Sequence, residues 1–457
     1  MTTWTSQMDS LIAPAVARSE VTDEVVVGAS VLTQAGALVR RMTALPRVLI
    51  CADETGFEAA GRPVVRSLEA AGFPVQTHIL PINPLPKASV EEAESFRAML
   101  ADDPDLFPVS VGSGVINDLA KYAAYRTDRR YVSVATAASM DGYTSAGAPL
   151  AENGFKVTIP TRAPIAMLAD LDIIAAAPAE MNGWGYGDLA GKVPAGGDWI
   201  LADALGVEPI DDVAWPMVQD HLAGWLAGHD GVKSGDRDSV ARLFTGLTAV
   251  GFAMEAHGSS RPASGADHQI AHMWEMEGLT DQGEKVSHGA AVSVGCVVSL
   301  ALFDWLLGQD LSLLNIDSVL NRTPDLATRE AHLSEVIADH KIAEKAKEEL
   351  AAKHAPPDIH AARLRALREG WPALRDRLAA HLYRHDTMAE MLQQAGAPAY
   401  AEQIGVSPDH LRTTMQAAAF IRRRYTIFDL LHDIGQFEAA IAAVMPTLTT
   451  SDLVAEL

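Results

Sequence analysis

The sequence has few cysteines and a shortage of basic residues, and each shortage excludes a class of protein. Its 457 residues include two cysteines, Cys51 and Cys296, both in apolar runs. Two buried thiols predict no disulfide framework, which fits a cytoplasmic location. Lysine and arginine number 36 against 59 aspartates and glutamates, so the net charge is −23. Because binding to a nucleic-acid backbone depends on surplus basic residues, no nucleic-acid partner is expected.

The sequence also lacks a recognisable targeting signal and a long apolar run. The opening residues MTTWTSQMDSLIAPAVARSE lack a basic segment followed by an apolar core, so no signal peptide is predicted. We find no uninterrupted apolar run of about 18 residues and expect no membrane insertion. Apolar residues make up 48% and charged residues 21% of the chain, as in ordinary globular proteins. The length favours two domains.

The N-terminal part of the chain alternates strand and helix patterns. RVLICAD (47–53) is a continuous apolar run of strand length, and a helical stretch follows it. Further strands are expected at 73–80, 106–112, 131–139 and within 164–178. This alternation predicts a parallel sheet covered by helices on both faces. We place this α/β domain at residues 1–180.

Helical patterns replace the strands after Pro178. DSVARLFTGLTAVGFAMEAHG and GAAVSVGCVVSLALFDWLLG are long helical stretches, and KIAEKAKEELAAKHAPPD predicts a charged, solvated helix that ends at a proline pair. Residues 181–457 are therefore expected to form an all-helical domain, with a single domain and a helical appendage as the alternative. The apolar helices also suit the interface of a homodimer, which is the expected assembly.

Two strand ends carry features of a dinucleotide site. Gly112 and Gly114 follow a strand and open a helix, where glycine lets the backbone approach a pyrophosphate. Asn117 replaces the third glycine of the G-x-G-x-x-G pattern, so a plain tight turn is an equal alternative. Asp53 ends an earlier strand, where an acid can bind an adenosine ribose and favour NAD over NADP, or can simply cap a helix.

The stretch VATAASMDGYTSAGAP follows another strand and is rich in small hydroxyl residues. The ligand crevice of a parallel sheet lies at such carboxyl ends. Thr136 and Ser139 are therefore candidate cofactor contacts, and Asp141 and Ser145 are candidates to face the crevice. An ordinary loop is the alternative.

Histidines gather in one stretch. The chain has 15 histidines, and four of them (His257, His268, His272 and His288) fall within 32 residues. His268 and His272 share one helix face at a spacing of four. Asp188 lies between glycines in GYGDLAGK, as a ligand or as a helix cap. A carboxylate with two or three imidazoles predicts a divalent-metal site, with zinc as the first choice and nickel or iron as alternatives.

Basic residues near this stretch are candidates to bind an anionic substrate. Arg261, in SSRPASG, is the best placed, with a surface salt bridge as the alternative. Lys156 and Lys192 are further candidates on weaker grounds.

Taken together, these segments resemble the glycerol-1-phosphate dehydrogenases, which belong to the group of glycerol dehydrogenase, iron-dependent alcohol dehydrogenases and dehydroquinate synthase. The resemblance rests on VGSGVINDLAK, TAASMDGYTSAGA, GYGDLAGK, SSRPASGADHQIAH and SHGAAVSVG, and it covers residues 25–310 in order. It implies a dehydroquinate synthase-like fold, with an α/β nucleotide-binding domain followed by an all-α domain. The chain departs from the family at Ser113 and Val115, which interrupt the glycine loop, and at Asp267, where glutamate is common.

The resemblance also assigns roles to residues. Asp188, His268 and His288 would hold the metal, and Asp141 and His272 would meet the substrate. The full set of predicted contacts to NAD or NADP is Asp53, Gly112, Gly114, Val115, Ile116, Asn117, Asp118, Thr136, Ser139 and Ser145.

The predicted reaction reduces dihydroxyacetone phosphate, a small phosphorylated substrate, to sn-glycerol 1-phosphate with NADH or NADPH. The metal would act as a Lewis acid, His272 would relay a proton, and Arg261 would hold the phosphate. One alternative is a lyase or cyclase like dehydroquinate synthase, in which NAD is recycled. The others are a dehydrogenase of another small polyol or polyol phosphate, and a non-catalytic relative.

Overall fold

The computed structural model describes residues 4–152 and 155–449, without the side chains of residues 4–7, 9, 10, 155 and 156. Contacts group the chain into two compact units. Unit 1 comprises Met1–Leu189, Pro216–Ser260 and Gln394–Gly396, and unit 2 comprises Ala190–Trp215, Arg261–Gln393 and Ala397–Leu457. The domain border near residue 180 stays a prediction.

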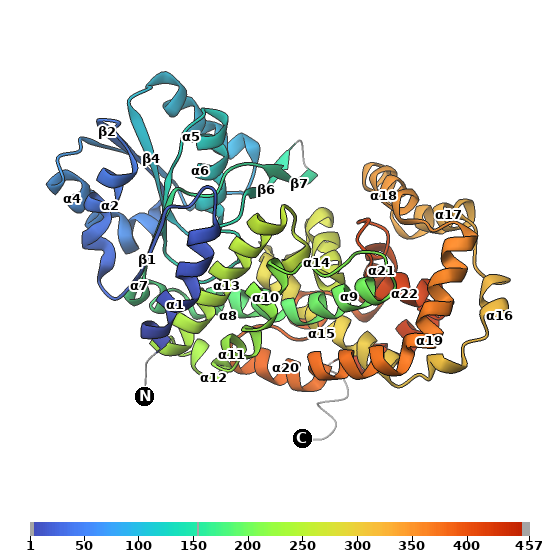
Figure 1. The fold of residues 1–457 in the computed structure, drawn as a ribbon. Helices are drawn as coiled ribbons and strands as arrows, with labels where there is room; N and C mark the ends of the chain where they lie inside the picture. The colour runs from blue at the N-terminus through green and yellow to red at the C-terminus, as the bar shows by residue number, and fades with distance from the viewer. Residues whose placement is uncertain (1–3, 153–154, 450–457) are drawn as a thin grey trace. The chain divides into compact units, whose positions relative to one another are not determined.

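Unit 1 is built on a parallel sheet of six strands in the order β1-β8-β5-β4-β2-β3 (Figure 1). The strands are β1 (Glu24–Gly28), β2 (Arg47–Asp53), β3 (Val75–Leu80), β4 (Leu106–Gly112), β5 (Val132–Ala135) and β8 (Ala166–Asp170). Strands β4 and β5 are buried along their whole length, as strands covered on both faces should be. The predicted parallel sheet is thus confirmed, although the strand expected at 131–139 already ends at Ala135, where the polar loop begins.

Two apolar cores cover the two faces of this sheet. Val48 and Ile50 of β2 point to one core, which includes residues of α2 (Ala35–Met42) and α4 (Arg62–Ala70). Leu49 and Cys51 point to the other, with α5 (Val90–Asp102) and α6 (Gly114–Arg126). The alternation along one strand follows from its side-chain period of two.

The other elements of unit 1 surround this sheet. A hairpin of β6 (Gly147–Glu152) and β7 (Phe155–Pro160), which the sequence did not predict, packs near α6. The remaining helices are α1 (Trp4–Arg18), α3 (Glu54–Gly56), α7 (Leu171–Ala175), α8 (Ala179–Ala190), α10 (Ala214–Gln219), α11 (Leu222–Leu226), α12 (His229–Val232) and α13 (Arg237–His257). Helices α8, α10 and α20 (His385–Gln394) each cross a border between the units.

Unit 2 is mainly helical, as the sequence predicts. Its helices are α9 (Lys192–Ala204), α14 (Ala266–Glu277), α15 (His288–Leu307), α16 (Ile316–Leu320), α17 (Leu326–Val336), α18 (His340–Lys353), α19 (Pro357–His381), α20 (His385–Gln394), α21 (Pro408–Ala418), α22 (Ile427–Asp433) and α23 (Phe437–Val444). A short hairpin of β9 (Thr280–Asp281) and β10 (Glu284–Lys285) departs from the helical expectation. Its turn residues Gln282 and Gly283 both have positive φ, as a tight hairpin turn requires.

Helix α15 bears on the expectation that the chain has no membrane-spanning segment. Among the described residues it is the one helix that is long and apolar enough to cross a membrane, with 20 residues and a mean hydropathy of 2.0. Its apolar window is 83% buried inside the protein. A helix that is apolar all round is also what the core of a large protein requires, so we interpret α15 as a core helix.

Candidate metal centre and active site

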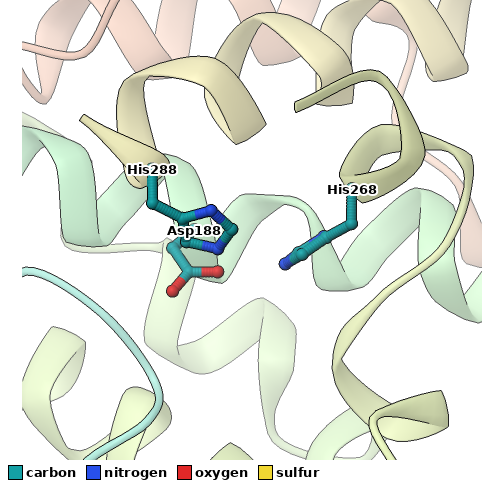
Figure 2. Close-up of side chains that lie close together, drawn as sticks. All are labelled: Asp188, His268 and His288. Carbon is teal, nitrogen blue, oxygen red and sulfur yellow. The ribbon is translucent and has the colours of Figure 1, made fainter. Parts of the chain in front are cut away.

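Asp188, His268 and His288 offer ligand atoms that all lie within 4.8 Å of one another. Figure 2 shows the ring of His268 directed toward the Asp188 carboxylate and the ring of His288. Asp188 lies in the last turn of α8, His268 in the first turn of α14, and His288 is the first residue of α15. The structure therefore brings together the three residues that the sequence predicts as metal ligands, and their role as ligands stays a prediction.

Buried carboxylates orient the two metal-site histidines. Nδ1 of His268 lies 2.5 Å from Oδ2 of Asp267, and Nδ1 of His288 lies 2.9 Å from Oε1 of Glu275. A neutral imidazole that donates from Nδ1 presents the lone pair of Nε2, which is how carboxylates orient histidine ligands of metals. One carboxylate and two imidazoles oriented in this way fit a divalent metal that keeps positions open for a substrate.

Glu275 was missed from the sequence. Its side chain is 5% exposed, and its two oxygens bind Nδ1 of His272 at 2.8 Å and Nδ1 of His288 at 2.9 Å. Ligand atoms of these three residues also lie within 4.8 Å of one another, and we interpret them as a hydrogen-bonded network because both contacts have ordinary hydrogen-bond lengths. The signal in the sequence was an acid three residues after His272, on the same helix face.

The environment of His272 keeps its imidazole neutral. Burial lowers the pKa of His272 to about 3, although the hydrogen bond and charge of Glu275 oppose the shift. With Nδ1–H donated to Glu275, the other ring nitrogen, Nε2, can accept a hydrogen bond. This arrangement suits the predicted contact with a substrate hydroxyl.

Asp188 is positioned by the polar loop after β5. Its Oδ2 accepts a hydrogen bond of 3.0 Å from the backbone N–H of Asp141. The same helix packs closely on that loop at Gly185, where a Cβ atom would lie 1.7 Å from the carbonyl oxygen of Ala138. Gly185 therefore permits backbone-to-backbone contact, and the predicted substrate residue Asp141 is tied to the predicted metal ligand.

Asp198 of α9 joins the start of α14 to the start of α22, and no motif in the sequence indicated it. Its two carboxylate oxygens accept hydrogen bonds of 2.7 Å from Ala266 N–H and 2.6 Å from Ile427 N–H. Burial raises the pKa of Asp198 to about 7, while these hydrogen bonds and Arg261 oppose the shift. The first turn that carries His268 is thus fixed by a buried carboxylate.

The side chain of Arg261 is buried within unit 2. Its side chain is 1% exposed, and its Nε lies 3.1 Å from Glu208. Its guanidinium donates to the carbonyl oxygens of Tyr425 at 3.3 Å and Asp198 at 3.1 Å. The predicted phosphate-binding role of Arg261 remains untested, but these contacts count against it because the group already fixes the protein backbone.

The predicted nucleotide residues meet at one edge of the sheet. Strands β2, β4 and β5 are neighbours, so their carboxyl ends bring Asp53, Gly112 and Thr136 to the same side. Thr136 N–H donates to the carbonyl oxygen of Gly112 at 3.2 Å. The start of α6 is also tight, since a Cβ on Gly114 would lie 2.7 Å from side-chain atoms of Met140.

Side chains in the first turns of α6 point into unit 1. Ile116 belongs to an apolar core, and Oδ1 of Asn117 accepts hydrogen bonds from Ser133 at 2.9 Å and Tyr131 at 3.2 Å. The backbone N–H of Asn117 donates to the carbonyl oxygen of Ser113 at 3.0 Å, so any contact of this turn with a dinucleotide falls to the N–H groups of Gly114, Val115 and Ile116. Val115 is only partly buried. Their cofactor roles stay predictions.

Lys121 anchors the polar loop, although no motif in the sequence indicated this role. Its side chain is 0% exposed, and Nζ lies 3.4 Å from Asp118. Nζ donates to the carbonyl oxygens of Gly142 at 2.7 Å and Gly147 at 3.0 Å. The hydroxyl of Ser145 also donates to Gly142, at 3.0 Å, so this predicted cofactor residue belongs to the same anchor.

Each of the remaining candidate residues has its own environment. Asp53 caps α3 by accepting a hydrogen bond of 2.6 Å from Gly56 N–H, which is the alternative role that the sequence left open. Ser139 is partly buried, and Lys192 is fully buried in α9. The backbone of Lys156 lies in β7, but its side chain falls outside the described part. His257 binds Ser259 at 2.8 Å and belongs to neither group of ligand atoms.

Comparisons with known proteins define the class first. Residues 26–178 match the family described as iron-containing alcohol dehydrogenase. Glycerol dehydrogenase from Schizosaccharomyces pombe is similar in structure, with a TM-score of 0.58, 18% identity, and coverage of 93% of this chain and 89% of that one. The NADH-dependent butanol dehydrogenase A from Thermotoga maritima gives a TM-score of 0.57 at 12% identity, with 92% and 97% coverage. At such low identity these structures define the fold, and they confirm the predicted fold class.

Curated relatives narrow the class further. A protein of Bacillus velezensis named glycerol-1-phosphate dehydrogenase (NAD(P)+) is 30% identical over 413 residues, which cover 90% of this chain and 91% of that protein. A protein of the same name from Methanosarcina mazei is 32% identical over 279 residues, with 61% and 76% coverage. The chain belongs to the glycerol-1-phosphate dehydrogenase family, which confirms the resemblance inferred from its motifs.

Proposed function

We propose that the chain is an NAD(P)-dependent dehydrogenase that interconverts dihydroxyacetone phosphate and sn-glycerol 1-phosphate. In the direction of reduction, the ketone, the reduced nicotinamide and one proton give the secondary alcohol and the oxidised nicotinamide. Family membership supports the reaction class. The observation that carries the proposal is the convergence of Asp188, His268 and His288 with carboxylates behind both imidazoles.

Two bound groups would supply the reactive chemistry. Asp188, His268 and His288 would hold one divalent ion, zinc as the first choice and nickel or iron as alternatives, which supplies a Lewis acid for the carbonyl oxygen. NAD or NADP would lie at the edge formed by Gly112, Gly114 and Thr136, and supplies or accepts the hydride. A homodimer and a cytoplasmic location complete the proposal. Both cysteines are free and buried, which agrees with that location.

His272 is the proposed proton carrier. Because Glu275 holds its Nδ1, its Nε2 faces the other way and would accept the hydroxyl proton when the alcohol is oxidised. In the direction of reduction the same nitrogen returns a proton to the substrate oxygen. Glu275 fixes the ring in the orientation that this transfer needs.

Arg422 is our candidate for the substrate phosphate, in place of Arg261. It follows α21, is exposed, and forms no hydrogen bond or ion pair with the described residues. Its charge acts on the metal region, because it contributes to the lowered pKa of His272. Glu349 and Glu275 in turn favour the charged form of Arg422.

The two following arginines are already bound. Arg423 holds Glu349 through two hydrogen bonds of its guanidinium, of 3.0 and 2.8 Å, and the Arg424 guanidinium donates to Ser264. Arg422→Gln should therefore raise KM for dihydroxyacetone phosphate by roughly tenfold or more, the loss of one charge-assisted contact. The KM for NADH should not change. Arg423→Gln is the matched control, and an equal rise in that variant would argue against the assignment.

The reaction itself is tested by following NADH and NADPH oxidation with three substrates: dihydroxyacetone phosphate, dihydroxyacetone and glyceraldehyde 3-phosphate. We expect the phosphorylated ketone to be the best substrate and net oxidation of the nicotinamide in each turnover. A lyase with recycled NAD would instead show turnover without net oxidation. That result would overturn the proposal.

A further inference from the structure

A small polar cavity lies in unit 2, beside the end of α18 and the start of α19. It measures about 20 Å³, enough for about one water-sized group. The basic side chains that line it are those of Arg329, Lys353 and Arg363, with the imidazoles of His354 and His360. We propose that this cavity binds a small anion of the phosphate type and takes one of its oxygens. The proposal goes beyond the dehydrogenase reaction and does not depend on it.

Unpaired donors carry the proposal. Nε and Nη2 of Arg329 and Nδ1 of His354 are buried atoms without a hydrogen-bond partner among the described residues. Buried polar atoms without partners are unfavourable, and a charged group such as a guanidinium most of all. Three such atoms on two side chains around one cavity predict a ligand that accepts hydrogen bonds. An oxyanion does so with every oxygen and also balances the charge.

The carboxylates at the cavity do not satisfy these donors. Asp429 binds Lys353 at 2.7 Å and accepts a hydrogen bond of 2.9 Å from Thr426 N–H. Asp433 accepts a hydrogen bond of 2.8 Å from the hydroxyl of Tyr425. Within the described ranges, neither carboxylate forms an ion pair with Arg329. The acids are thus committed to other groups, and an uncompensated positive charge remains.

The remaining groups at the cavity strengthen its positive character. Arg363 stacks over the ring of Tyr425 at 5.5 Å, an arrangement that leaves its positive charge in place. The 25-residue helix α19 begins here at Pro357, and no side chain caps its first turn. Pro356 and Pro357 carry no N–H, so the N–H groups of Asp358 and Ile359 and the dipole of the helix are what favour an anion at this end.

The position of the cavity indicates what an anion would do. Arg329 belongs to α17, Lys353 ends α18, Arg363 lies in α19 and Asp429 in α22 (orange to red in Figure 1). An anion held by these groups would join helices that are far apart in the sequence. It would bind the folded protein and not the unfolded chain, so above its Kd it should raise the unfolding temperature with the logarithm of its concentration.

The test measures binding of inorganic phosphate to the full chain by calorimetry and by thermal unfolding, at constant ionic strength set with chloride. Arg329→Gln should weaken phosphate affinity by roughly tenfold or more and reduce the thermal shift at a given phosphate concentration. His354→Gln is a second variant that should weaken binding in the same direction. Arg365→Gln, an exposed arginine on the same helix as Arg363, is the matched control and should bind like the wild type.

The substrate phosphate site is a second possible source of a signal. The Arg422→Gln variant separates the two, because phosphate binding at the cavity should persist there and weaken in Arg329→Gln. Absence of phosphate binding to the cavity in the wild type would overturn the proposal and indicate that the cavity holds water only. Unchanged binding in Arg329→Gln would overturn it as well.

Discussion

The predicted nucleotide edge of unit 1 and the histidine group of unit 2 (His268, His272 and His288) differ in which atoms are available to a ligand. At the nucleotide edge, Ile116 and Asn117 face inward, and the backbone near Gly114 is what remains to meet a ligand. In the histidine group, imidazole side chains are the proposed ligands, and Glu275 and Asp267 orient them. We therefore expect substitutions that remove a side chain to reduce activity most in the histidine group. Substitutions that add atoms should reduce activity most at the nucleotide edge, where they would crowd the backbone.

The largest effect is expected when a proposed metal ligand is removed. His268→Ala should lose the bound metal after dialysis and lower kcat by roughly 10³-fold, because Lewis-acid assistance contributes several kcal/mol. Metal content and NADH oxidation measure the two effects. His257→Ala is the control, since His257 belongs to neither ligand group. Full metal content in His268→Ala would show that His268 is not a metal ligand, and the proposed difference between the two regions would no longer hold.

Removing the charge of Glu275 tests orientation without deleting a ligand. Glu275→Gln should weaken metal affinity by about 10- to 100-fold, as changes to groups that orient metal-binding histidines typically do. A competition titration with a chelator measures that affinity. Glu277→Gln, on the same helix and paired with the more exposed His410, should leave it unchanged. If both variants bind metal equally, Glu275 does not orient the site.

An added methyl group tests the packing at the polar loop of the nucleotide edge. Gly185→Ala would place a Cβ against the carbonyl oxygen of Ala138, and because a backbone atom cannot move alone, the loop must shift. We expect a loss of stability of about 1–3 kcal/mol and a higher KM for NADH. Gly370→Ala, in a helix with open space around it, should be neutral or slightly stabilising. Equal stability of the two variants would show that the loop adapts freely.

The smallest expected effect concerns the pH dependence of stability. Since burial raises the pKa of Asp198 to about 7, the folded protein keeps a proton that the unfolded chain releases near pH 4. Stability from this group is present at low pH and is lost as pH rises toward 7. Relative to Asp198→Asn, the wild type should lose about 1–2 kcal/mol of unfolding free energy between about pH 5.5 and pH 7. Parallel pH profiles from denaturant unfolding would contradict this.

Local patterns allowed much of the fold to be predicted. The runs that became β2 and β4 are continuous and apolar because both faces of the sheet are covered. The hairpin of β6 and β7 was missed because it lies outside that sheet, in a stretch rich in small and polar residues. The hairpin of β9 and β10 was missed because two-residue strands leave no period to detect.

Some residues of the candidate site could likewise be predicted from the sequence, and others could not. Asp188, His268 and His288 could be grouped from motifs because their residue types and contexts are distinctive. Asp198 could not be found, since one of its partners, Ile427, is 229 residues away. The orientation of Arg261 could not be predicted either. A basic residue beside a histidine cluster gives the same sequence pattern whether its side chain faces a ligand or the backbone.

The most direct test of the central claim is metal removal and restoration during reduction of dihydroxyacetone phosphate. Protein stripped with a chelator should lose NADH oxidation and regain it when one divalent metal, such as zinc, nickel or iron, is added back. Asp188→Asn should neither retain the metal nor recover activity. Undiminished oxidation by the stripped wild type, or by metal-free Asp188→Asn, would contradict the account.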